Sequence, residues 1–113
     1  MIARAHRFHG RGSLRPVYNR GQVSRGQFFA LKYLPNSRRK TYRAAVVVSR
    51  KVHKSAVVRN RIRRRIYELI RLSPLAERPP IDLVCVVYSE HVAALPANEL
   101  QRQFMAQLEA VLQ

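Results

Sequence analysis

The sequence predicts a small α+β domain, a two-layer sandwich in which helices pack on one β-sheet. Three observations support this fold class. The 113 residues leave room for one hydrophobic core. Three segments repeat apolar residues at helical spacing, and three others have the composition and length of strands. We expect the order helix, strand, strand, helix, strand, helix within a single domain spanning residues 13–113.

Residues 1–12 are expected to form a flexible basic arm that precedes this domain. They include three arginines, two histidines and two glycines, with too few apolar groups to fold alone. His6 and His9 have the H-x-x-H spacing of some metal sites, but no third ligand lies nearby in the sequence. We therefore expect no metal site in the arm.

The first two elements are a short helix over residues 13–19 and a strand over residues 27–34. Ser13 is the expected N-cap of the helix, and Pro16 suits its first turn. The helix has a more apolar side, which consists of Leu14, Val17 and Tyr18. The strand alternates so that one face is more apolar, and that face consists of Phe29, Leu31 and Tyr33.

Residues 35–40 have turn composition with three consecutive bases, and a second strand is expected over residues 41–49. The short connection predicts an antiparallel hairpin. A third strand over residues 81–88 is nearly all apolar, so we place it centrally in the sheet. Cys85 in this strand is expected to be a buried hydrophobe and not a reactive thiol.

The helix over residues 55–72 carries the strongest signal. Its apolar stripe recurs at helical spacing and consists of Val58, Ile62, Ile66 and Leu69. Five arginines lie between Arg59 and Arg65, and such like-charge crowding opposes helix formation. A polyanion would offset this cost, and Glu68 is expected to pair with Arg64 or Arg65. The last helix, over residues 97–112, has one apolar side, which should cover a sheet face.

The charge distribution favours nucleic acid as the partner. The net charge is +16, and residues 1–67 hold 19 of the 22 basic side chains and none of the six acidic ones. A solvated surface of mixed charge explains this asymmetry poorly. A lone cysteine, no apolar run of membrane-spanning length and no signal peptide predict a cytoplasmic protein without a membrane partner.

A basic amphipathic helix also suits anionic membranes or the DNA major groove. Here the apolar stripe is needed for a core, and the segment before the helix is typical of a strand. Catalytic residues are not expected in the polypeptide, because it has a single aspartate, no paired carboxylates and no cysteine nucleophile with a partner.

The motif AVVRNRIRRRIYE at residues 56–68 resembles the hallmark helix of the protein component of bacterial ribonuclease P. The strand that ends at Val48 before Ser49-Arg50-Lys51, and the strand led by Asp82, are similar to the elements that flank this helix in the family. The resemblance covers roughly residues 7–112. Leu14 and Tyr67 depart from it, because the family commonly has phenylalanine and arginine at these places.

The resemblance implies an accessory subunit that binds a catalytic RNA, with magnesium held mainly by that RNA and no obligate protein partner. The holoenzyme would remove the 5′ leader of precursor tRNA. It also implies a left-handed β-α-β crossover around the arginine-rich helix, against the usual hand. The residues implied to contact the catalytic RNA are Arg59, Asn60, Arg61, Arg63 and Arg64. Those implied to contact the leader are Leu14, Tyr18, Ala30, Lys32, Ser49, Arg50 and Lys51.

Tyr18 and Lys32 together offer the stacking surface and the charge that single strands require, although packing of Tyr18 between helix and sheet is an equally good explanation. Two rival functions stay open at this stage: another RNA-binding protein, such as a ribosomal one, and a protein-only nuclease.

Overall fold

The sheet has four strands in the order β1-β2-β4-β3. In the computed structural model, which describes residues 4–8 and 14–112, these are β1 (Gln22–Arg25), β2 (Phe29–Pro35), β3 (Arg43–Val48) and β4 (Ile81–Val87). β2 is antiparallel to both β1 and β4, whereas β3 is parallel to β4. The apolar strand β4 is central, as expected, with β2 on one side and β3 on the other.

The expected hairpin between the strands over residues 27–34 and 41–49 was wrong. β2 and β3 are not neighbours, because β4 lies between them. β4 is buried along nearly its whole length and takes the position with a partner on each side. The hairpin is instead β1–β2, and the sequence did not suggest β1 because that strand is short and mostly exposed.

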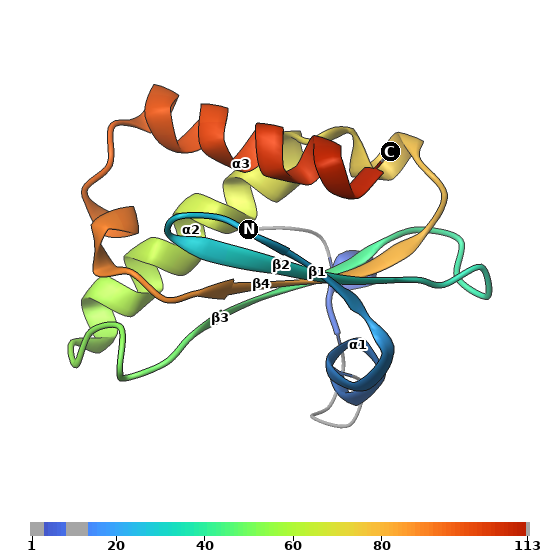
Figure 1. Cartoon of the computed structure of the whole chain (residues 1–113), viewed down its shortest axis with the longest axis horizontal. Coiled ribbons are helices and arrows are strands. Elements are labelled where there is room, and N and C mark those ends of the chain that lie inside the picture. The colour runs from blue at the N-terminus through green and yellow to red at the C-terminus, as the bar shows by residue number, and fades with distance from the viewer. Residues whose placement is uncertain (1–3, 9–13, 113) are drawn as a thin grey trace.

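Three α-helices flank the sheet: α1 (Arg15–Arg20), α2 (Ala56–Leu72) and α3 (Ala97–Leu112). α2 and α3 cover one face, and α1 lies on the opposite side (Figure 1). Short 3₁₀ turns occur at Arg4–His6, Pro74–Glu77 and Glu90–Ala93. The α+β class is confirmed, with α2 forming the crossover between the parallel strands β3 and β4. The hand of that crossover stays a prediction.

The main core lies between the sheet and the helices α2 and α3. Alternate residues of each central strand point into it, and Phe29 of β2 contacts Phe104 of α3 with ring centroids 5.8 Å apart. The expected stripe of α2 is confirmed at Ile62, Ile66 and Leu69, which are buried. None of the helices in the described part of the chain is long and apolar enough to cross a membrane.

A smaller apolar contact holds α1 on the outer face of the sheet. Val17, Ala30 and Val84 are buried but do not belong to the main core. Pro16 is in the first turn of α1, as expected, while the proposed cap Ser13 lies outside the described residues. Gly21 ends the helix, and its backbone N–H donates to the Val17 carbonyl.

The described part of the N-terminal arm lies against the edge strand β3. Arg7 forms a parallel bridge with Ala44, and the His6 ring stacks on Tyr42 with centroids 4.1 Å apart. The other residues of the predicted arm, including His9, are outside the described ranges.

Candidate nucleic-acid interface

The arginine-rich helix α2 begins at a capped turn that one of its own arginines holds together. Ser55 is the N-cap, and its hydroxyl accepts a hydrogen bond from the Val58 N–H. Arg59 donates from Nη1 to the carbonyls of His53 and Lys54, both at 2.9 Å. Arg59 therefore fixes the turn between β3 and α2, and its half-buried guanidinium is partly used within the protein.

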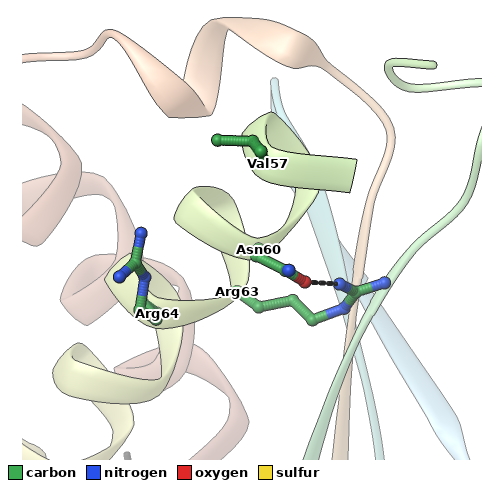
Figure 2. A pocket seen from close by; sticks show the side chains of 4 residues that line it. All are labelled: Val57, Asn60, Arg63 and Arg64. Carbon is green, nitrogen blue, oxygen red and sulfur yellow. Dashed lines mark hydrogen bonds between the residues drawn. The ribbon is translucent and has the colours of Figure 1, made fainter. Parts of the chain in front are cut away.

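Arg63 joins the first turns of α2 to the end of β3. Its Nη1 donates to Asn60 Oδ1 at 2.6 Å, and its Nη2 donates to the Val48 carbonyl at 3.3 Å. Figure 2 shows the bond to Asn60 beside the exposed helix surface. Asn60 is exposed and its amide group keeps further donors, so the pair remains open to a ligand.

Arg65 has a structural role on the other side of the helix. Its guanidinium donates to the Val92 carbonyl at 2.6 Å and also to the Leu95 carbonyl, tying α2 to the segment before α3. Burial lowers the pKa of Arg65, and the nearby charge of Arg61 lowers it further. Arg65 was not among the residues expected to bind RNA, and its guanidinium is engaged within the protein.

The expected pairing of Glu68 with Arg64 or Arg65 was wrong. Glu68 forms an ion pair with Arg71, one turn further along the helix. The hydrogen bond that Arg71 donates to this carboxylate lowers the pKa of Glu68. Arg65 is engaged with the two carbonyls and is unavailable. Arg64 keeps an uncompensated charge.

The exposed surface of α2 combines two free arginines with an apolar patch. Arg61 and Arg64 are exposed, and their guanidiniums form no hydrogen bond or ion pair with any other residue in the described ranges. Val57 has 75% of its surface exposed, which is unusual for valine. Together with Asn60, Arg63 and Arg64 it lines an open pocket of about 610 Å³ (Figure 2). Guanidiniums beside an apolar floor suit a phosphate next to a sugar or base.

Sequence reasoning missed Val57, although a helical wheel would have found an apolar residue at a solvent position. Tyr67 stands where the family commonly has arginine, which puts an RNA contact at this place in doubt. In the structure Tyr67 is half-buried, and its hydroxyl accepts a hydrogen bond from the Val46 N–H at 3.2 Å. The side chain thus links α2 to β3.

A second candidate region lies between α1 and the outer face of the sheet. Lys32 Nζ is 4.4 Å from the ring centroid of Tyr18, so the expected stacking surface and charge are in contact. Tyr18 is 43% exposed, and its partial burial raises the pKa of its hydroxyl. Leu14 is half-buried beside it, whereas Ala30 is only 3% exposed and forms the floor.

Ser49, Arg50 and Lys51 form an exposed turn after β3. Ala30 and Val47 both pair with Val86, so they lie on either side of it on the outer face. At about 4.8 Å per strand, the turn is on the order of 10 Å across the sheet from β2. The structure therefore brings Tyr18 and Lys32 together directly, and leaves residues 49–51 at the far end of the same face.

Comparisons with known proteins identify the family to which the chain is similar. The family model described as Ribonuclease P matches residues 2–111. A ribonuclease P protein component from Thermus scotoductus is 51% identical over 51 residues, which cover 45% of this chain and only 29% of that protein. The same component from Chloroflexus aurantiacus is 34% identical over 107 residues, covering 95% of this chain and 78% of the other.

Among solved structures, the RNase P protein of Staphylococcus aureus has a TM-score of 0.81 and 19% identity, with 94% of each chain covered. At this identity the likeness supports the fold alone. The family match covers nearly the whole chain, and so this chain belongs to the ribonuclease P protein family.

Proposed function

We propose that this chain is the accessory protein subunit of an RNA-catalysed ribonuclease that removes the 5′ leader of precursor tRNA. The observation that carries the proposal is the exposed surface of α2, where Asn60, Arg63 and Arg64 line a pocket with the exposed Val57, and where Arg61 is exposed on the same helix. A polyanion with accessible sugars and bases fits this surface, and the family membership supports the catalytic RNA as that polyanion.

The second part of the proposal assigns the single-stranded leader to the region between α1 and the sheet. An exposed aromatic ring with a lysine on its face can stack a base and attract the adjoining phosphate. Val17 and Ala30 are buried between α1 and the sheet, so the helix that carries the ring is packed before RNA arrives. Residues 49–51 would extend the contact along the sheet.

The assignment of catalysis to the RNA rests on the chemistry of the protein's carboxylates. Asp82 is the single aspartate, and both its oxygens accept hydrogen bonds from Arg43. Glu68 and Glu99 pair with neighbouring arginines. No three potential ligands in the described ranges lie close enough together to hold a metal ion. The residues present do not fit a protein-held magnesium site, so we assign catalytic magnesium to the RNA. The cytoplasm remains the proposed location.

Reconstitution tests the proposal. Purified protein and catalytic RNA should cleave precursor tRNA together at low magnesium, while the protein alone should not. Cleavage by the protein alone would favour a protein-only nuclease. If the reconstituted complex bound mature tRNA as tightly as leader-bearing precursor, the leader assignment would be wrong.

Two sets of variants separate the surfaces. Arg61→Ala and Arg64→Ala should each reduce the log-log salt slope of catalytic RNA binding by about 0.7–0.9 per lost phosphate contact. Arg71→Ala is the matched control, since it lies on the same helix but pairs with Glu68. Tyr18→Ala should weaken precursor binding and spare assembly, and Tyr18→Phe should retain the stacking. A Tyr18→Ala protein that does not fold would make Tyr18 a packing residue.

A further inference from the structure

Helix α1 divides the outer face of the sheet into two regions. Residues two apart on a helix point about 200° apart, so Tyr18 and Arg20 lie on opposite sides of α1. The region beside Tyr18 is the proposed leader site. The region beside Arg20 opens into a separate pocket of about 450 Å³, bounded by α1, the loop after β2 and the ends of β3 and β4. Its polar lining consists of Arg20, Asn36, Ser37, Arg38, Arg43 and Asp82.

The carboxylate in this pocket is already neutralised. Asp82 is 3% exposed and accepts from Arg43 Nε at 2.9 Å and Nη2 at 2.8 Å, with a third bond from Asn36 at 3.0 Å. These bonds with Asp82 are the main cause of the raised pKa of Arg43. The Phe8 ring lies 4.4 Å from the Arg43 guanidinium carbon and closes its other side. The pair therefore presents no free negative charge to a ligand.

The same contacts position the loop that carries Arg38. Asn36 is fixed by Asp82 and by its own N–H, which donates to the Pro80 carbonyl at 3.0 Å. Arg39 donates to the carbonyls of Thr41 and Ala5, so this member of the three-base run is used internally. Arg38, by contrast, is exposed. The three consecutive bases after β2 have no role at the α2 surface or in the leader site. Among them, Arg39 is anchored within the protein and Arg38 is free to meet a ligand.

Two free arginines line the pocket from different elements. Arg20 of α1 and Arg38 of the loop are both exposed, and neither guanidinium forms a hydrogen bond or ion pair within residues 4–8 and 14–112. The Ser37 hydroxyl adds a neutral donor. Guanidinium forks from two walls, with a hydroxyl and no free carboxylate, suit a tetrahedral oxyanion.

We propose that this pocket binds a backbone phosphate of an RNA strand through Arg20 and Arg38, as a third contact separate from the α2 surface and from the Tyr18 region. The inference rests on the RNA-binding role proposed above. The phosphate could come from the catalytic RNA or from the precursor, and the chemistry is the same in both cases.

The test uses the double variant Arg20→Gln/Arg38→Gln in the full chain. The matched control is Arg78→Gln/Arg102→Gln, which removes the same charge from two exposed arginines elsewhere. Salt slopes are measured for catalytic RNA binding, for holoenzyme binding to a long-leader precursor, and for binding to a precursor with a shortened leader. The double variant should lose about 0.7–0.9 of slope, one phosphate contact, relative to the control.

The measurement in which the salt slope falls identifies the source of the phosphate. A loss with catalytic RNA alone assigns the phosphate to that RNA, and a loss only with the long leader assigns it to the leader. Salt slopes equal to those of the control in all three binding measurements overturn the proposal.

A second readout keeps the result independent of the proposed function. The protein is titrated with a short single-stranded RNA while the Nε–H signals of Arg20 and Arg38 are followed by NMR. Shifts at these two arginines, absent at Arg78, support the pocket even if holoenzyme assembly fails. If neither signal moves while Arg61 and Arg64 respond, the phosphate site does not exist.

Discussion

Replacing Arg65 by alanine should destabilise the protein without removing an RNA contact. The side chain donates two hydrogen bonds, to the carbonyls of Val92 and Leu95. A hydrogen bond to a charged group contributes about 1.5–3 kcal/mol. Because the guanidinium is half-buried, water can reach part of the vacated space, and we take the lower end for both bonds. The expected loss is about 3 kcal/mol of unfolding free energy.

For a chain of this length, that loss corresponds to a drop in Tm of roughly 10 °C. The assay is thermal unfolding followed by far-ultraviolet circular dichroism, beside the neighbouring variant Arg64→Ala. Arg64 is exposed, so its removal should change stability by no more than about 0.5 kcal/mol. The two variants remove the same side chain one position apart, and their difference isolates the role of the carbonyl contacts.

The RNA-binding result should be the reverse. At a temperature where both variants are folded, Arg64→Ala should lower the salt slope for catalytic RNA and Arg65→Ala should leave it unchanged. A Tm within about 3 °C of the parent for Arg65→Ala would refute the structural role. An equal loss of slope in both variants would show that Arg65 also meets a phosphate.

Three further variants or treatments test other parts of the structure. Complete burial raises the pKa of the Cys85 thiol, so the native protein should not react with Ellman's reagent at pH 8, whereas one thiol should react in guanidinium chloride; rapid native reaction would contradict the burial. Tyr67→Phe should lower the free energy of unfolding by about 1–2 kcal/mol, because the Val46 N–H loses its acceptor, and RNA binding should be unchanged. A fall in RNA affinity at constant stability would show that Tyr67 contacts the RNA. Gly21→Ala should cost about 1–3 kcal/mol, because the added Cβ would lie 2.3 Å from the Val17 carbonyl oxygen, and wild-type stability would show that α1 can shift freely.

The sequence predicted the elements better than their arrangement. The spacing of Leu100, Phe104 and Leu108 defined α3 to the residue, because an amphipathic helix against a sheet has a strong period of its own. The partner of β3 could not be found that way. Strand pairing depends on which surfaces remain to be buried after α2 crosses the sheet, and a local pattern contains no information about that.

The candidate site shows the same limit at the level of single side chains. On a helical wheel Arg64 falls opposite the apolar stripe, and Arg61 and Arg63 fall on its two flanks. In the structure Arg61 and Arg64 are exposed, whereas Arg63 is half-buried. Arginine has a long side chain, so its guanidinium can reach a carbonyl well away from its own Cα. The bonds from Arg63 to Val48 and from Arg65 to Val92 join segments distant in sequence, and no spacing rule indicates them.

These carbonyl bonds change how the charge of the arginine run is balanced. Five guanidiniums in seven residues required a compensating charge, and phosphate was the candidate. Arg59, Arg63 and Arg65 already direct their charge at carbonyl oxygens of the flanking loops and β3. Only Arg61 and Arg64 are left without such partners in the described ranges. The helix can therefore fold before RNA binds, so that binding energy at Arg61 and Arg64 is not spent on forming the helix.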